Sequence, residues 1–240
     1  MPHAPIARMG GKKNLKKRLI AMFPKEYDTF VEPFVGAGNI FYSTPKVANE
    51  IINDKDKDMY IIHKGLKERS QYIQDNIPRT FSRAAFVDIR KNGKDDILST
   101  IYRYKVGFMG KGLSYNASRE GQKISMDFTQ FGERLKDVKI LNRDYASVIK
   151  HYDSPTTFFY LDPPYEGAGK YKDYPDTSVT PQNIYDTLQG LQGKFMLSYN
   201  NSDNIKEIFS KYTITPIKTQ YSATTNVDAR PADELVITNY

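Results

Sequence analysis

Apolar and polar residues alternate along this chain in short blocks, a pattern that favours an α/β domain. The strand-like blocks are rich in aromatic or β-branched residues. The segments between them contain glycine or proline, or have apolar residues at helical spacing. They lie at residues 28–34, 47–52, 138–141, 157–161, 195–199, 213–215 and 235–239. Because the strands alternate with longer segments, we expect a sheet in which most strands run parallel.

Helices are predicted where apolar residues recur every three or four positions. Residues 56–66 and 95–107 have this spacing, and Asn14 is placed to cap a shorter helix that follows it. Residues 67–94, between the two longer helices, are polar and show no clear period. We therefore expect irregular structure over residues 67–94.

The composition limits what the chain can be. Its 240 residues suffice for one sizeable core, interpreted as one domain with an insertion. A net charge of +7 and the absence of acids from residues 1–25 suit a polyanionic partner. Cysteine is absent and the histidines are far apart, so we expect no disulfide and no metal site. No apolar run approaches about 18 residues and no signal peptide is evident, which predicts a soluble, intracellular protein.

The first candidate site follows the strand at residues 28–34. A turn of sequence Phe34-Val35-Gly36-Ala37-Gly38 leads into the helix-compatible segment 39–42, and its glycines would let a ligand approach the backbone closely. The next strand ends at Asp54, about twenty residues after the turn begins, a spacing that suits a carboxylate binding ribose hydroxyls. A nucleoside ligand without pyrophosphate fits S-adenosylmethionine. Asp54 could equally belong to a solvated charge run that caps the next helix.

The second candidate site is Asp162-Pro163-Pro164-Tyr165, directly after the apolar run 157–161. A carboxylate and a prolyl-locked carbonyl can accept hydrogen bonds from an amine on a nucleobase, which favours the pyramidal nitrogen that attacks. The aromatic side chain can stack on the base. A strand followed by a plain Pro-Pro turn is the alternative. The motif favours amine methylation, because few reactions need this set of residues at the end of a buried strand.

These motifs, in this order, resemble those of the Dam-type (D12 class) DNA N6-adenine methyltransferases of bacteria, phages and other viruses. The resemblance covers nearly the whole chain and rests on residues 5–12, 31–38, 54, 162–165, 197–200 and 233–240. The order of the motifs corresponds to the α arrangement of these enzymes. It implies a Rossmann-like methyltransferase fold with a mostly parallel sheet, an antiparallel final strand and an inserted recognition subdomain. It also implies methyl transfer from S-adenosylmethionine to adenine N6 in double-stranded DNA, with base flipping.

The resemblance further implies a division of the chain and a set of site residues. Residues 1–66 and 136–240 would form the catalytic domain, and residues 67–135 the inserted target-recognition subdomain. The catalytic residues would be Asp162, Pro163, Pro164 and Tyr165. The cofactor-binding residues would be Arg8, Gly10, Lys12, Phe34, Gly36, Gly38, Asp54, Asp144, Tyr145 and Asp162. Arg8 stands where many family members have tryptophan, and Asp144 and Tyr145 could instead belong to an ordinary polar loop.

Basic and amide residues are the candidates for DNA contact. Lys16 and Lys17 lie on the polar face of the first helix, where phosphate contact and simple solvation are equally good interpretations. Residues 107–131 resemble the family's DNA-contacting hairpin, although an ordinary exposed hairpin is also polar. The candidate DNA-binding residues are Lys16, Lys17, Lys111, Tyr115, Asn116, Arg119, Lys123 and Arg230. The long segment 166–179, beside the catalytic motif, suggests a lid.

The sequence leaves other functions open. The same motif could methylate cytosine N4, adenine in RNA or a glutamine amide in a protein. A DNA-binding descendant without activity is an alternative of a different class. The intact motif from Asp162 to Tyr165 argues against it, because an inactive descendant need not keep both the acid and the aromatic. A cognate restriction enzyme is a candidate partner.

Overall fold

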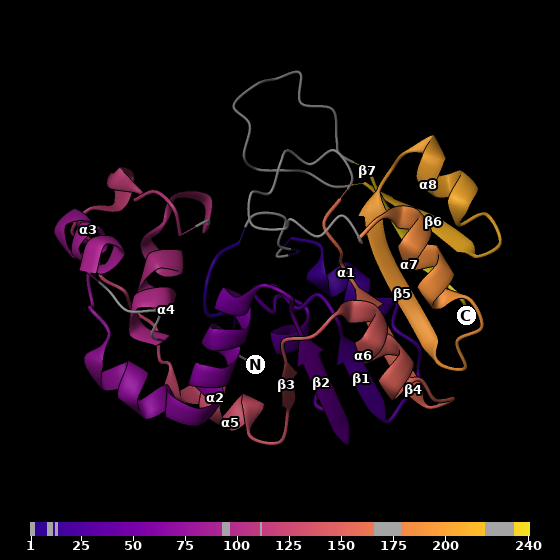
Figure 1. The fold of residues 1–240 in the computed structure, drawn as a ribbon, viewed down its shortest axis with the longest axis horizontal. Coiled ribbons are helices and arrows are strands. Elements are labelled where there is room, and N and C mark those ends of the chain that lie inside the picture. Colours follow the sequence, from indigo (N-terminus) through magenta and orange to yellow (C-terminus); the bar gives the residue numbers. More distant parts are fainter. Residues whose placement is uncertain are drawn as a thin grey trace. The chain divides into compact units, whose positions relative to one another are not determined.

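The chain folds into alternating strands and helices, as the computed structural model in Figure 1 shows. The structure describes residues 3–8, 12, 14–92, 97–110, 112–165, 179–218 and 233–240. The strands are β1 (Thr29–Glu32), β2 (Asn49–Asn53), β3 (Lys139–Leu141), β4 (Thr157–Leu161), β5 (Lys194–Asn200), β6 (Thr213–Lys218) and β7 (Asp233–Thr238). The α-helices are α1 (Lys16–Ala21), α2 (Lys57–Asn76), α3 (Arg83–Asn92), α4 (Ile97–Val106), α5 (Thr129–Leu135), α6 (Tyr145–Tyr152), α7 (Pro181–Leu188) and α8 (Asp203–Ile208). Short 3₁₀ turns are η1 (Phe41–Ser43), η2 (Phe108–Gly110) and η3 (Ala117–Arg119).

The chain divides into two compact units that are discontinuous in sequence. Unit 1 consists of Met1–Lys13, Val35–Pro45 and Asp54–Asn142. Unit 2 consists of Asn14–Phe34, Lys46–Asn53 and Arg143–Tyr240. The expected recognition subdomain, residues 67–135, falls wholly within unit 1, and its boundaries stay a prediction.

Unit 2 is built on a sheet whose strands follow the order β2-β1-β4-β5-β7-β6. β1 pairs in parallel with both β2 and β4, and β4 pairs in parallel with β5. β7 runs antiparallel to β5 and to β6. The expected strands, the mostly parallel sheet and the antiparallel final strand are therefore confirmed.

Both faces of this sheet are covered, which explains why β4 is a continuous apolar run without alternation. Phe158 contacts Phe23, which follows α1, with ring centroids 4.6 Å apart. Phe159, which points to the opposite face, is in register with Phe195, whose ring lies 4.9 Å from that of Tyr212. In Figure 1, α6 and α7 lie across the strands of this unit. Asp162 therefore directly follows a strand that is buried along its whole length.

Unit 1 is organised around α2, whose Met59, Ile62, Leu66 and Ile73 are fully buried at helical spacing. Its most extensive helix partners are α5 and α4. The helix extends past the end expected from sequence, and it is kinked at Arg69, where φ is −140° and ψ is 30°. The helices expected at 56–66 and 95–107 are confirmed as parts of α2 and as α4.

The expectation of irregular structure over residues 67–94 is wrong. This segment contains the second half of α2 and the whole of α3. Ile73 and Phe86 are buried and anchor the two helices, while most other side chains of the segment face solvent. A helix held by so few apolar contacts has almost no sequence period, so tertiary packing decides its formation.

Two local predictions are also wrong. Asn14 does not cap α1, because the N-cap residue is Leu15, which offers no capping side chain. The segment after the glycine turn forms only the 3₁₀ turn η1, not an α-helix. The turn therefore lacks a helix N-terminus directed at a ligand, and its own amides and neighbouring acids must supply the polar contacts.

Candidate active site

The glycine turn of unit 1 adopts a backbone that requires glycine. Gly36 and Gly38 have φ values of 49° and 77°, and the Gly38 amide donates to the Val35 carbonyl oxygen at 2.8 Å. A Cβ on Gly38 would lie 2.7 Å from the ring of Tyr42. The turn is therefore specified by positive φ at both positions and by a tight neighbour at the second.

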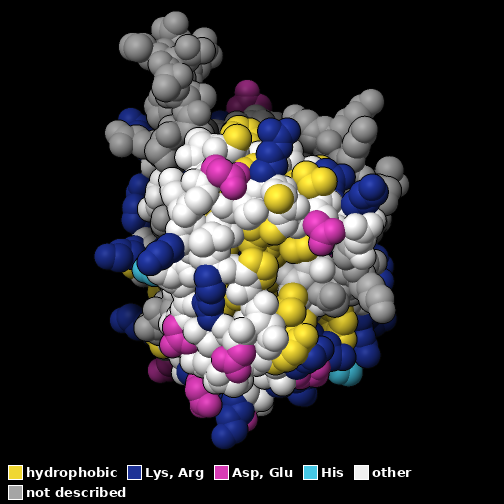
Figure 2. All heavy atoms as spheres, turned by 90° about the vertical axis from the view of Figure 1, so that its left-hand side faces the viewer, with side chains coloured by type: hydrophobic (Ala, Val, Ile, Leu, Met, Phe, Trp, Pro, Cys, Tyr) yellow, Lys and Arg dark blue, Asp and Glu magenta, His cyan; other side chains and the backbone are white. Residues whose placement is uncertain are grey.

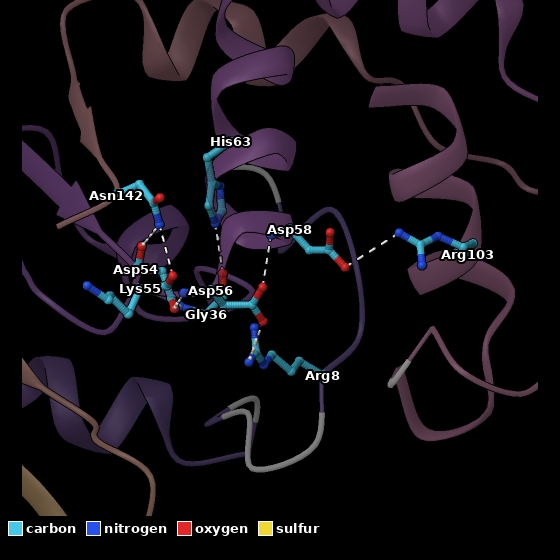
Figure 3. A network of polar contacts seen from close by, with 9 residues as sticks. All are labelled: Arg8, Gly36, Asp54, Lys55, Asp56, Asp58, His63, Arg103 and Asn142. Carbon is cyan, nitrogen blue, oxygen red and sulfur yellow. Dashed lines mark hydrogen bonds and ion pairs between the residues drawn. The ribbon is translucent and has the colours of Figure 1, made fainter. Parts of the chain in front are cut away.

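Asp54 holds this turn directly (Figure 3). Its Oδ2 accepts the Gly36 amide at 2.8 Å, and its Oδ1 accepts the Asp56 amide at 2.9 Å. The cap of α2 is instead Asp56, whose Oδ1 accepts the Asp58 amide at 2.9 Å. A carboxylate oxygen can accept more than one hydrogen bond, so an acid that holds the turn can also accept a ribose hydroxyl. The geometry thus fits an acid that shapes the turn and also contacts a nucleoside.

His63 supports the turn from behind and was missed as a site residue by the sequence analysis. Its Nε2 lies 2.8 Å from the Gly36 carbonyl oxygen and its Nδ1 lies 2.9 Å from the Tyr42 hydroxyl. Since a carbonyl can only accept, Nε2 carries the proton and Nδ1 accepts from Tyr42. Complete burial lowers the pKa of His63 to about 4. The helical spacing of His63 with Met59 and Leu66 was the available signal, because it places the imidazole on the buried face of α2.

The buried histidine predicts acid sensitivity. Its unfolded pKa is about 6.5, so between pH 6.5 and 4 the unfolded chain binds a proton that the folded chain does not. We expect this group to lower the free energy of unfolding by roughly 3 kcal/mol as the pH falls through that window. Urea unfolding at pH 7 and pH 4.5 would measure the loss, and His63→Gln should lose less between the two pH values. Equal pH dependence of wild type and variant would contradict a neutral His63.

Arg8 lies beside the same cluster. Its Nη2 forms an ion pair with Asp56 Oδ2 at 2.9 Å (Figure 3). Its Cδ is the nearest atom, at 3.8 Å, to the place where a Cβ on Gly36 would lie. Arg8 is thus next to the turn, and its expected contact with the cofactor stays a prediction.

The motif Asp162–Tyr165, which is expected to be catalytic, lies in unit 2 at the end of β4. The Tyr165 hydroxyl lies 3.5 Å from Asp162 Oδ1, at the outer limit of a hydrogen bond. The ring of Tyr165 stacks on that of Tyr199, with centroids 5.2 Å apart and planes inclined by 27°. Tyr199 is fully buried, and its hydroxyl lies 3.5 Å from the Pro164 carbonyl oxygen. The structure therefore brings the acid and the aromatic together, and Tyr199 is a supporting residue that the list of site residues lacked.

A polar pair lies beneath Asp162 on the same face of the sheet. The hydroxyl of Tyr160 is 3.0 Å from Ser198 Oγ, and both residues are fully buried. The pKa of Tyr160 is raised well above its usual value, mainly by burial and to a smaller extent by the nearby charge of Asp162. Tyr160 therefore stays neutral, and its hydroxyl satisfies Ser198 instead of adding a second charge near the acid.

Ring packing and side-chain hydrogen bonds link the neighbouring strand ends of unit 2. The rings of Phe34 and Tyr145 pack with centroids 5.0 Å apart. Asn53 donates from Nδ2 to the Pro33 carbonyl at 2.9 Å and accepts the Arg143 amide at 2.8 Å. Asp144 caps α6 by accepting the amides of Ala146 and Ser147. Phe34 and Tyr145 are thus brought together, Asn53 was missed, and the cofactor contacts expected for Asp144 and Tyr145 stay predictions.

The expected DNA-binding hairpin is only partly a hairpin. Isolated antiparallel bridges join Gly107 to Tyr115 and Thr80 to Lys123, and 3₁₀ turns replace regular strands. Arg119 packs on the ring of Phe81 at 4.1 Å and donates to Gln122 at 2.9 Å. The base and phosphate contacts expected of this segment stay predictions.

The other expected site residues differ in their surroundings. Lys12 is buried, Lys17 is exposed, and Asn116 accepts the Ser118 hydroxyl at 2.7 Å. Gly10, Lys111, Arg230 and residues 166–178 of the expected lid lie outside the described residues. Within the described residues, no cluster of acids and histidines suited to a metal ion occurs, and no helix has the length and apolarity needed to cross a membrane.

The reversed β7 in a mostly parallel sheet, and a glycine turn followed by an acid after the next strand, are the features expected of an S-adenosylmethionine-dependent methyltransferase. A family model of the "D12 class N6 adenine-specific DNA methyltransferase" matches residues 9–223. The chain belongs to this family, so it is an enzyme that uses S-adenosylmethionine to methylate adenine in DNA.

Individual relatives are distant but cover most of the chain. The Type II methyltransferase M1.LlaDCHI of Lactococcus lactis subsp. cremoris is 23% identical, over 96% of this chain and 93% of the relative. The Type II methyltransferase M.CviBI of Paramecium bursaria Chlorella virus NC1A is 24% identical, over 98% of this chain and 99% of the relative. A DNA adenine methylase of Vibrio cholerae serotype O1 is 26% identical, over 65% of this chain and 62% of the relative.

Solved structures resemble the chain only loosely. A SAM-dependent O-methyltransferase from Thermotoga maritima has 12% identity and a TM-score of 0.41 over 94% of this chain. A possible methylase from Clostridium difficile 630 has 15% identity and a TM-score of 0.44 over 95% of this chain. The chain spans 64% and 52% of the lengths of these two proteins.

Proposed function

We propose that this chain methylates the N6 amine of adenine in double-stranded DNA, with the target base rotated out of the duplex into the site at Asp162–Tyr165. The observation that carries this proposal is that Tyr165 lies beside Asp162, with its hydroxyl 3.5 Å from Asp162 Oδ1 and its ring stacked on that of Tyr199. A base inside a duplex cannot present its amine to such a site, so it must leave the stack.

In the proposed mechanism, the Asp162 carboxylate and the Pro163 carbonyl accept the two N–H groups of the amine. S-adenosylmethionine supplies an electrophilic methyl group when bound. The acceptors favour a pyramidal nitrogen whose lone pair points at that methyl group. Formation of the N–C bond would break the bond from sulfur to the methyl carbon and release S-adenosylhomocysteine, and the cationic nitrogen would then lose its acidic proton to Asp162 or to water. The site therefore needs an acceptor of good geometry more than a strong base.

The same proposal assigns Tyr165 to the base and the glycine turn to the cofactor. Tyr165, backed by Tyr199, would stack on the adenine ring and fix its plane. Asp54 would accept the ribose hydroxyls, and Gly36 and Gly38 would allow close approach to the backbone. The remaining proposed cofactor residues are Arg8, Gly10, Lys12, Phe34, Asp144, Tyr145 and Asp162.

Product analysis tests the proposal against its competitors. Protein incubated with labelled S-adenosylmethionine should place label in N6-methyladenine of duplex DNA, and not in N4-methylcytosine, in RNA or in glutamine. Label mainly in another product would overturn the choice of substrate. An absence of transfer to any of them would favour the non-catalytic alternative.

Because DNA is the substrate, we also propose an intracellular location. The Type II names of two relatives support a cognate restriction enzyme as partner.

Basic residues support electrostatic binding of DNA. The chain carries a formal charge of +7, and Figure 2 shows lysine and arginine side chains around the border of one face, with apolar side chains nearer its centre. In unit 1, Phe108 and Leu113 are about half exposed, and Arg90 donates to the Leu113 carbonyl. Cationic side chains beside exposed apolar ones suit a surface that meets both phosphates and bases.

We expect DNA affinity to fall steeply with salt, and Lys16 and Lys17 to contribute. Changing both lysines to alanine should reduce the slope of log K against log salt by up to about two units, because each phosphate contact contributes about 0.9. Fluorescence anisotropy at several salt concentrations measures the slope. The double variant Lys136→Ala, Lys150→Ala removes the same charge from exposed positions and should keep the slope nearer that of wild type. Equal slopes for the two double variants would place Lys16 and Lys17 on a merely solvated face.

A further inference from the structure

Residues Pro5–Arg8, here called the N-terminal strap, contact two functional parts of unit 1. At its end, Arg8 forms the ion pair with Asp56. At its start, the Pro5 carbonyl accepts a hydrogen bond from Lys105 Nζ at 3.1 Å, and Lys105 lies in the last turn of α4. Ile6, between them, is buried. The strap thus joins the first turn of α2 to the helix that leads into the expected DNA-binding segment.

Gly110 provides the closest contact of the strap. This residue has a φ of 65°, and a Cβ built on it would overlap the Ala7 carbonyl oxygen and lie 2.9 Å from the Arg8 Cα. Gly110 ends η2, three residues after the bridge residue Gly107. The backbone of the strap therefore rests against the backbone of the expected recognition segment, at a place where a side chain cannot be accommodated.

The other end of the strap reaches the cofactor acid through a continuous set of polar contacts (Figure 3). The Asp56 amide donates to Asp54 Oδ1, and Asp56 Oδ2 pairs with Arg8. Arg103 of α4 pairs with Asp58 at 3.5 Å, which adds a second link between α2 and α4. These contacts connect Asp54 to the strap through Asp56 and Arg8.

We propose that the N-terminal strap couples S-adenosylmethionine binding at Asp54 to DNA binding by residues 107–131, with Gly110 as its positioning residue. This inference rests on the proposed roles of Asp54 and of that segment. Ordering of the strap by one ligand lowers the entropic cost of binding the other, so each ligand tightens the binding of its counterpart by the same factor.

The coupling factor is the ratio of DNA dissociation constants without and with S-adenosylhomocysteine, which binds but cannot react. Fluorescence anisotropy with duplex DNA and the full chain measures it. We expect roughly a tenfold factor for wild type, within the usual range of such couplings. Gly110→Ala should bring the factor close to one. A merely structural role of Gly110 in the DNA-binding segment would change both dissociation constants equally and leave the ratio intact.

Gly121→Ala is the matched control. Gly121 also has a positive φ, of 74°, but a Cβ there meets nothing within 4 Å. Alanine therefore imposes the same kind of backbone strain without touching the strap, and the coupling factor should stay at the wild-type value. Loss of coupling in the Gly121 variant as well would overturn the assignment to the strap.

Lys105→Met is a second test that does not depend on tolerance of alanine at position 110. Lys105 is only partly exposed, and methionine is an uncharged side chain of similar length that cannot donate a hydrogen bond. It removes the bond to Pro5 and should reduce the coupling factor severalfold.

A wild-type factor in both Gly110→Ala and Lys105→Met, or no coupling in wild type, would overturn the strap proposal. DNA methylation that persists in these variants would leave the proposed function standing, whereas wild type that forms no N6-methyladenine would refute that function separately.

Discussion

Replacing Asp162 with alanine is expected to reduce the turnover number for DNA methylation by roughly 10²–10³-fold. In the proposed mechanism, the carboxylate accepts an N–H of the target amine most strongly when the nitrogen becomes pyramidal and cationic, so its removal should raise the barrier rather than only weaken binding. Single-turnover transfer of labelled methyl groups to duplex DNA measures the effect. Cofactor affinity should be measured alongside, since Asp162 is also a proposed cofactor contact.

Tyr165→Phe is the matched control for this variant. It removes the hydroxyl that lies 3.5 Å from Asp162 Oδ1 but keeps the ring that stacks on Tyr199. Its activity should stay close to that of wild type, whereas Tyr165→Ala should lose about 1–3 kcal/mol of stacking on the base. 2-Aminopurine at the target position would report that loss as poor stabilisation of the rotated base. Normal methylation by Asp162→Ala would mean that the reacting amine is held elsewhere.

Replacing Asp54 with alanine is expected to weaken S-adenosylmethionine binding by roughly 1.5–3 kcal/mol, about 10- to 150-fold in dissociation constant. Two losses combine in this variant. The ribose hydroxyls lose a charged acceptor, and the Gly36 amide loses the oxygen that holds it at 2.8 Å. Isothermal titration calorimetry of the free protein gives the affinity without involving DNA.

Asp75→Ala provides the comparison, because Asp75 is an exposed acid at the far end of the same helix. Its affinity for the cofactor should match that of wild type. If Asp54→Ala bound S-adenosylmethionine as tightly as wild type did, Asp54 would serve the glycine turn alone. A lower melting temperature with unchanged affinity would be the signature of that structural role.

Much of the candidate site could be predicted because its determinants are local. The apolar run 157–161 predicts a strand buried on both faces, and the motif at Asp162 follows it directly in sequence. The glycine turn and Asp54 are recognisable for a similar reason, since the ends of neighbouring parallel strands lie at one edge of a sheet. The structure places Asp54 on the Gly36 amide, and the ribose contact that the spacing suggested stays a prediction.

The residues that support these groups could not be identified in the same way. His63 contacts Gly36 across 27 residues of sequence, and Tyr199 contacts Pro164 across 35. A tyrosine in an apolar strand or a histidine on a helical face has many equivalent interpretations until its neighbours are known. The mistaken expectation for residues 67–94 has a related origin, because α3 depends on the burial of Phe86 and not on a strong period.

By itself, the sequence determined the class of fold and the family, and it supplied the groups that we propose to react. These follow from short-range order: apolar periodicity, glycines with positive φ, and motifs attached to strand ends. Only the tertiary structure decided how the groups are held, with His63 behind the glycine turn, Tyr199 against Tyr165 and the N-terminal strap on Gly110. Such contacts join residues far apart in the chain, and their free energy depends on burial and distance, which no local pattern encodes.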